Sequence, residues 1–64
     1  MFKYVSCRPD EYLKVTLREP RTTVTLAPGV HIDAGYFWTS FRDSRKREWH
    51  VPTYNIAAIV KKKI

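Results

Sequence analysis

The chain has 64 residues, enough for one domain over residues 1–64, and its 44% hydrophobic content favours a folded domain over a disordered chain. Twelve Lys and Arg residues against six Asp and Glu give a formal net charge of +6, which attracts polyanions. The chain has a single cysteine and no metal-ligand spacing, cofactor motif, secretory signal or long apolar run. These features predict a cytoplasmic protein with no disulfide, metal or cofactor and no membrane partner.

The first half of the chain alternates between apolar and polar residues as β-strands do. We expect an opening strand over residues 2–7, a turn over residues 8–11 and a hairpin formed by residues 12–18 and 22–26. Pro9 supports the turn because it fixes its own φ and favours an extended residue before it. The residues expected to face the core are Leu13, Val15, Leu17, Thr22, Val24 and Leu26.

The middle of the chain continues the pattern after a turn at Pro28 and Gly29, which stand in the order that a type II turn requires. Another strand follows over residues 30–34. Gly35 then interrupts the pattern, and an isolated glycine between strand residues indicates a bulge or a sharp bend. The residues of this strand that we expect to face inward are Val30, Ile32 and Ala34.

An aromatic hairpin is predicted over residues 36–51, with a polar turn at residues 43–46. Alternation places Phe37, Thr39 and Phe41 on one face and Tyr36, Trp38 and Ser40 on the other. A shift of one residue would exchange the two sets, leaving Trp38 in the core. On the returning strand, the residues expected to face inward are Trp49 and Val51.

No window has apolar residues at helical spacing, and short strands recur with turn signals between them. The fold class is therefore predicted to be all-β. At this length we expect a single small antiparallel barrel of five to six strands, because closure removes the open edges that promote aggregation.

Residues 49–59, WHVPTYNIAAI, resemble the ending of Src-homology-3-like and related small barrels. The resemblance implies a strand that enters a proline, one turn of tight helix and a short closing strand. The chain lacks the early paired aromatic residues and the acidic loop of a proline-rich-peptide site, because residues 43–47 are mainly basic. Sm-like barrels share this architecture and bind RNA, but their glycine and asparagine signature is absent here.

Two basic clusters are the candidate phosphate contacts: the predicted hairpin turn and the end of the last strand. Their members are Arg42, Arg45, Lys46 and Arg47 in the turn and Lys61, Lys62 and Lys63 at the end. The alternative is a solvated loop and a frayed tail. Tyr36 and Trp38, large rings beside the basic hairpin, are candidate surfaces for stacking on unpaired bases.

The two histidines and the cysteine do not indicate catalysis. His31 and His50 lie near no nucleophile motif or phosphate-binding glycine loop, and Cys7 fits a small core residue better than a reactive thiol. We therefore expect no enzyme and no catalytic residues. The first hypothesis is a nucleic-acid-binding protein, for DNA or RNA. The alternative is a small adaptor or inhibitor, of the kind that phages encode, that binds an acidic patch on a larger protein.

Overall fold

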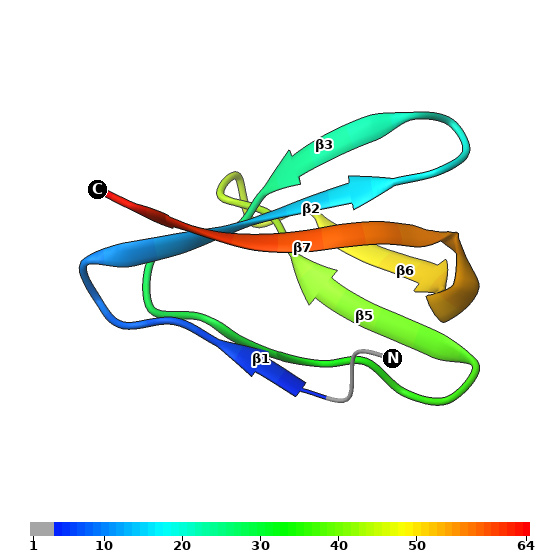
Figure 1. The fold of residues 1–64 in the computed structure, drawn as a ribbon, viewed down its shortest axis with the longest axis horizontal. Helices are drawn as coiled ribbons and strands as arrows, with labels where there is room; N and C mark the ends of the chain where they lie inside the picture. Colours follow the sequence, from blue (N-terminus) through cyan, green and yellow to red (C-terminus); the bar gives the residue numbers. More distant parts are fainter. Residues whose placement is uncertain (1–3) are drawn as a thin grey trace.

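The computed structural model describes residues 4–64, and these form a small all-β domain (Figure 1). No helix within this range is long and apolar enough to cross a membrane. The elements in chain order are β1 (Tyr4–Ser6), β2 (Glu11–Leu17), β3 (Thr22–Thr25), β4 (His31–Asp33), β5 (Trp38–Arg42), β6 (Glu48–Pro52), the 3-10 helix η1 (Thr53–Asn55) and β7 (Ile56–Lys63). Residues 2 and 3 of the predicted opening strand lie outside the described residues.

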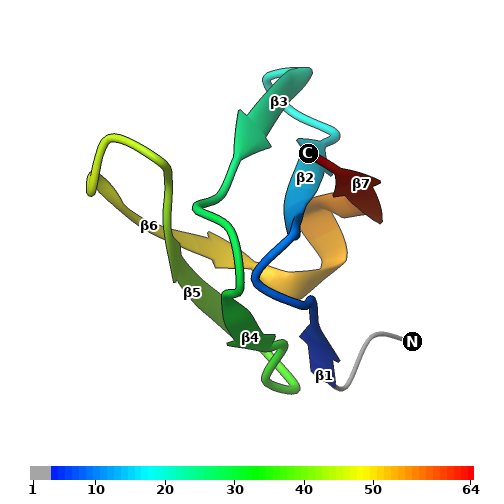
Figure 2. The ribbon, with the colours of Figure 1, turned by 90° about the vertical axis from the view of Figure 1, so that its left-hand side faces the viewer.

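The strands pair antiparallel in three sheets, ordered β3–β2–β7, β5–β6 and β1–β4. Figure 2 shows β6, β5, β4 and β1 following one another, with β3, β2 and β7 above them. A bridge between Ala34 and Thr39 joins β4 to β5, and the Ser44 N–H donates to the Thr25 carbonyl (2.8 Å). Within residues 4–64 the sheets do not close into a barrel, in contrast to the predicted one, because η1 carries the chain from β6 to β7 without pairing these strands.

The core lies between these layers and confirms most of the predicted inward residues. It contains Leu13, Val15, Leu17, Val24, Leu26, Ile32, Ala34, Phe41, Val51 and Ile56. Thr22, Val30 and Trp49, also predicted to face inward, are only half-buried. Trp49 is only half-buried because its indole N–H donates a hydrogen bond to Asp43 in the β5–β6 turn (3.0 Å).

A bend at Gly35 precedes β5, as the sequence predicts. A Cβ atom on Gly35 would lie 2.6 Å from the carbonyl oxygen of Trp38, so the chain can only fold back this tightly at glycine. The prediction that Phe37 faces the core is wrong. Phe37 lies in the bend, before the regular alternation of β5 begins at Trp38, and its ring is exposed.

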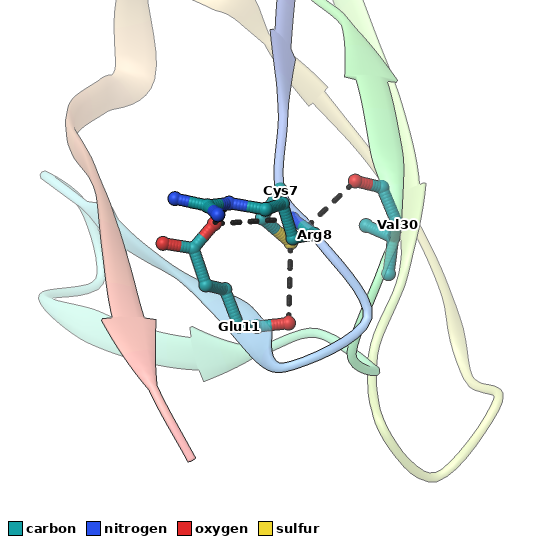
Figure 3. Close-up of polar contacts among 4 residues, drawn as sticks. All are labelled: Cys7, Arg8, Glu11 and Val30. Carbon is teal, nitrogen blue, oxygen red and sulfur yellow. Dashed lines mark hydrogen bonds and ion pairs between the residues drawn. The ribbon is translucent and has the colours of Figure 1, made fainter.

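Cys7 joins the end of β1 to the neighbouring strands (Figure 3). Its half-buried thiol lies 3.4 Å from the carbonyl oxygen of Glu11 and 3.6 Å from that of Val30, and it packs against the core. The Arg8 N–H donates to the Glu11 carboxylate (3.1 Å) and closes the turn between β1 and β2. These contacts fit the predicted structural role of Cys7.

Candidate functional site

The outward face of the β5–β6 hairpin carries many of the predicted site residues. The register pairs Trp38 with Pro52, Ser40 with His50 and Arg42 with Glu48 on this face. The inward residues of β5 are Thr39 and Phe41, which are buried. The sequence-based assignment of Trp38 and Ser40 to the outer face is confirmed, and the alternative with Trp38 in the core is wrong.

The basic end of this face is the turn from Asp43 to Arg47. The Lys46 N–H donates to the Asp43 carbonyl (2.9 Å), and the Asp43 N–H donates to the Arg47 carbonyl (3.0 Å). Arg47 places its guanidinium 5.0 Å from the centre of the Trp49 ring. Arg42, Arg45, Lys46 and Arg47 are all exposed, so the turn brings the first predicted basic cluster together.

Asp43 organises this turn with its carboxylate. One oxygen accepts the indole N–H of Trp49 (3.0 Å), and the other accepts the backbone N–H groups of Arg45 (2.9 Å) and Arg47 (2.8 Å). The hydrogen bond from Trp49 is the main cause that lowers the pKa of Asp43 below its ordinary value of 3.8. The two backbone hydrogen bonds and the charge of Arg47 act in the same direction, against partial desolvation.

This lowered pKa predicts a pH dependence of the turn. The carboxylate of Asp43 stabilises the folded state above pH 3.8, and this contribution is lost as the pH falls through the lower pKa of the folded protein. We expect urea unfolding to show falling stability over this acidic range, together with a changed Trp49 fluorescence. Asp43→Asn should remove that part of the pH dependence; an identical acid profile in the variant would contradict the assignment.

Lys46 has a backbone conformation that normally favours glycine, with φ of 68°. A left-handed conformation costs an L-residue about 1–2 kcal/mol. We therefore expect Lys46→Gly to raise the free energy of unfolding by about 1 kcal/mol in thermal or urea unfolding. Lys46→Asn, which tolerates this conformation, is the control for loss of charge; a Gly variant less stable than wild type would contradict the prediction.

The second basic cluster lies on the end of β7. Lys61, Lys62 and Lys63 pair with Leu13, Tyr12 and Glu11 of β2, so these lysines belong to a strand and not to a frayed tail. Figure 1 places the C-terminus and the β5–β6 turn toward the same end of the molecule, and Figure 2 shows them apart. They therefore form two separate basic patches.

The positive charge of both patches has few carboxylate partners. Within residues 4–64 the ion pairs join Arg8 to Glu11 (3.9 Å) and Arg42 to Glu48 (3.7 Å). The three lysines of β7 are exposed and form no ion pair inside this range. Most of the basic side chains of the two patches are thus available to an anionic ligand.

The opposite end of the hairpin is aromatic. Tyr36 is 77% exposed, Phe37 71%, Trp38 52% and Tyr54 80%, which is unusual for rings of this size. They border a groove of about 480 Å³ between the bend and η1. The residues that form its rim are Arg18, Tyr36, Phe37, Trp38, Pro52 and Tyr54.

The sequence reasoning missed this groove as a unit. The sequence analysis placed Phe37 in the core and assigned no role to Arg18. The available signal was the resemblance over residues 49–59, which places Tyr54 in a tight helical turn next to the strand that pairs with Trp38.

Tyr36 and Trp38 lie at the end of the hairpin that is far from the basic turn. Trp38 is at one end of β5 and Arg42 at the other, four residues along the strand. At about 3.3 Å per residue their Cα atoms lie roughly 13 Å apart. The rings and the basic turn therefore occupy opposite ends of one outward face.

His50 lies between these two ends. Its ring stacks on that of Trp38, with centroids 4.7 Å apart and planes at 9°, and its Nδ1 lies 2.7 Å from the Ser40 hydroxyl oxygen. A hydroxyl beside an imidazole is the beginning of a nucleophile–base pair, but a third group must orient the base. Glu48, the neighbouring carboxylate on β6, pairs with Arg42 instead.

No protein family, curated protein or solved structure matches the chain.

Proposed function

We propose that this chain binds nucleic acid, DNA or RNA, mainly through the phosphates. The observation that carries the proposal is the excess of basic side chains in the two patches, few of which have a carboxylate partner. Lys and Arg that neutralise phosphates release condensed counterions, and this drives binding without sequence preference. The proposal is for a cytoplasmic binding protein without catalytic activity or cofactor.

The fold supports the proposal because it provides a scaffold for the charged side chains. The path from β6 through Pro52 and η1 into β7 has the strand–turn–strand order of Src-homology-3-like barrels, and we include that relationship in the proposal. Small β-domains of this kind hold loops and strand faces rigidly, so that charges on them have defined positions. Function is nevertheless argued from the charged and aromatic residues, because one fold hosts many functions.

The experiment is a fluorescence-anisotropy titration of labelled single-stranded DNA, duplex DNA and RNA at several salt concentrations between about 50 and 200 mM. Affinity should fall steeply with salt. Replacing Arg45, Lys46 and Arg47 together by Gln should reduce the slope of log K against log salt by about 0.7–0.9 for each phosphate that the variant no longer neutralises. Arg21→Gln, in the turn between β2 and β3 and away from both basic patches, is the control and should leave the slope unchanged. An unchanged slope in the triple variant would remove the turn from the site.

A second candidate function follows from the exposed rings. Trp, Tyr and Arg are enriched among the residues that dominate protein–protein binding, and Trp38, Tyr54 and Arg18 lie together at the groove. The chain would then be an adaptor or inhibitor that docks on an acidic patch of a larger protein. In that case Trp38→Ala should weaken binding more than the loss of any single charge, and purified DNA and RNA should bind only weakly.

A further inference from the structure

We propose that the aromatic groove between the Gly35 bend and η1 binds unpaired bases, which makes the ligand a single-stranded nucleic acid. This inference rests on the proposed function and adds to it a site for the bases. A phosphate-binding surface alone does not distinguish single strands from duplexes. A groove bordered by rings does, because only unpaired bases can stack in it.

The rings offer open faces to a ligand. His50 covers one face of Trp38 and lies outside the groove, whereas Trp38 itself lines the groove and remains half-exposed. The other face of the indole is therefore open on the groove side. Tyr36 and Phe37 meet edge to face, with centroids 4.7 Å apart, which leaves Phe37 at the rim in a fixed orientation.

The groove is held open by the backbone beneath it. Thr53, the first residue of η1, donates its N–H to the Phe37 carbonyl (2.9 Å) and its hydroxyl to the Gly35 carbonyl (2.7 Å). These two bonds connect the wall that carries Phe37 and Trp38 to the wall that carries Tyr54. A site formed before binding loses less entropy when the ligand enters.

The charges around the groove favour a nucleic acid over an apolar peptide. Among the described residues that line the groove, Arg18 carries the charged side chain, and its Nε donates to the Tyr54 carbonyl (3.1 Å). This bond engages only the Nε, so the Nη groups of this exposed residue can contact a phosphate. From Trp38 the outward face of β5 leads to Arg42 and the basic turn, so a strand with bases in the groove can place later phosphates on the turn.

The test compares oligonucleotides of about ten residues that carry bases, as oligo-dT and oligo-U, with an abasic phosphodiester of equal length and with a duplex. The base-containing single strands should bind about 5- to 100-fold more tightly than the abasic strand, the factor expected for one or more stacked bases. Trp fluorescence should be quenched by the same ligands only. The two base-containing strands also establish whether DNA or RNA is preferred.

Variants then assign the effect to the groove. Trp38→Ala should reduce oligo-dT binding to the abasic level and leave abasic binding unchanged, whereas Trp38→Phe should retain most of the difference. Thr16→Ala, on β2 outside the groove and outside both basic patches, is the control. Circular dichroism of each variant verifies that it is folded, and Tyr54→Ala, at an exposed ring of the same groove, carries the test if Trp38→Ala is not folded.

The outcomes separate this inference from the proposed function. Equal, salt-sensitive binding of base-containing and abasic strands would overturn the base site and leave the phosphate-binding function intact. Failure of every strand to bind at about 50 mM salt would overturn both. The groove would then be assigned to a protein partner.

Discussion

Replacing Gly35 by Ala should destabilise the domain by about 2–3 kcal/mol, more than any surface substitution. The added Cβ would lie 2.6 Å from the Trp38 carbonyl oxygen, a backbone atom that no side-chain rotation can move away. The bend must therefore open. Since a small domain has marginal stability, this loss leaves a substantial unfolded fraction at physiological temperature.

The measurement is urea unfolding followed by circular dichroism, together with the NMR signal of the Trp38 indole N–H. Opening the bend should shift that signal, because Trp38 directly follows the bend. Gly29→Ala is the matched control. Gly29 has a positive φ, of 73°, which Gly35 does not, and an added Cβ at Gly29 meets the Pro9 Cα only at an ordinary 3.5 Å. It should cost about 1–2 kcal/mol and leave the Trp38 signal in place. Equal effects of the two changes would show that the steric contact at Gly35 is unimportant.

Alternation predicted the central strand because its two faces have different surroundings. Leu13, Val15 and Leu17 of β2 are buried, and the residues between them are only half-buried, so period-two hydrophobicity reports the fold directly. The same rule failed at Phe37. The prediction extends the alternation of β5 into the bend, where the chain reverses direction at Gly35 and the side chains do not alternate between two faces.

Closure of the sheets and the shape of the site depend on contacts between residues far apart in the sequence, which local sequence patterns do not show. Whether β6 pairs with β7 is determined by the direction that η1 gives the chain, and this depends on Thr53 reaching Gly35, 18 residues earlier. The groove exists for the same reason. Local sequence identified the rings and the basic residues, but the groove also needs Arg18 and Tyr54, which contacts distant in sequence bring to Trp38.

A buried pair of threonines fixes the base of the groove, and the direction of its hydrogen bonds follows from chemistry. The Thr53 hydroxyl lies 2.7 Å from the Gly35 carbonyl, which can only accept, so Thr53 donates there. The Thr39 hydroxyl, 2.8 Å from that of Thr53, must then donate to Thr53. The Thr53 hydroxyl thus donates one hydrogen bond and accepts another, whereas the Thr39 hydroxyl donates one.

This asymmetry predicts unequal costs for two similar changes. Thr53→Val leaves the half-buried Gly35 carbonyl and the buried Thr39 hydroxyl without these partners, and should cost about 2–6 kcal/mol at about 1–3 kcal/mol for each group. Thr39→Val removes only a donor to an oxygen that still donates elsewhere, and should cost about 1 kcal/mol. Urea unfolding of both variants gives the comparison, with Thr53→Ser as the control that keeps the hydroxyl. If Thr39→Val were the more costly change, the assigned hydrogen-bond direction would be reversed, and the Thr53 hydroxyl would not be the group that bonds to the Gly35 carbonyl.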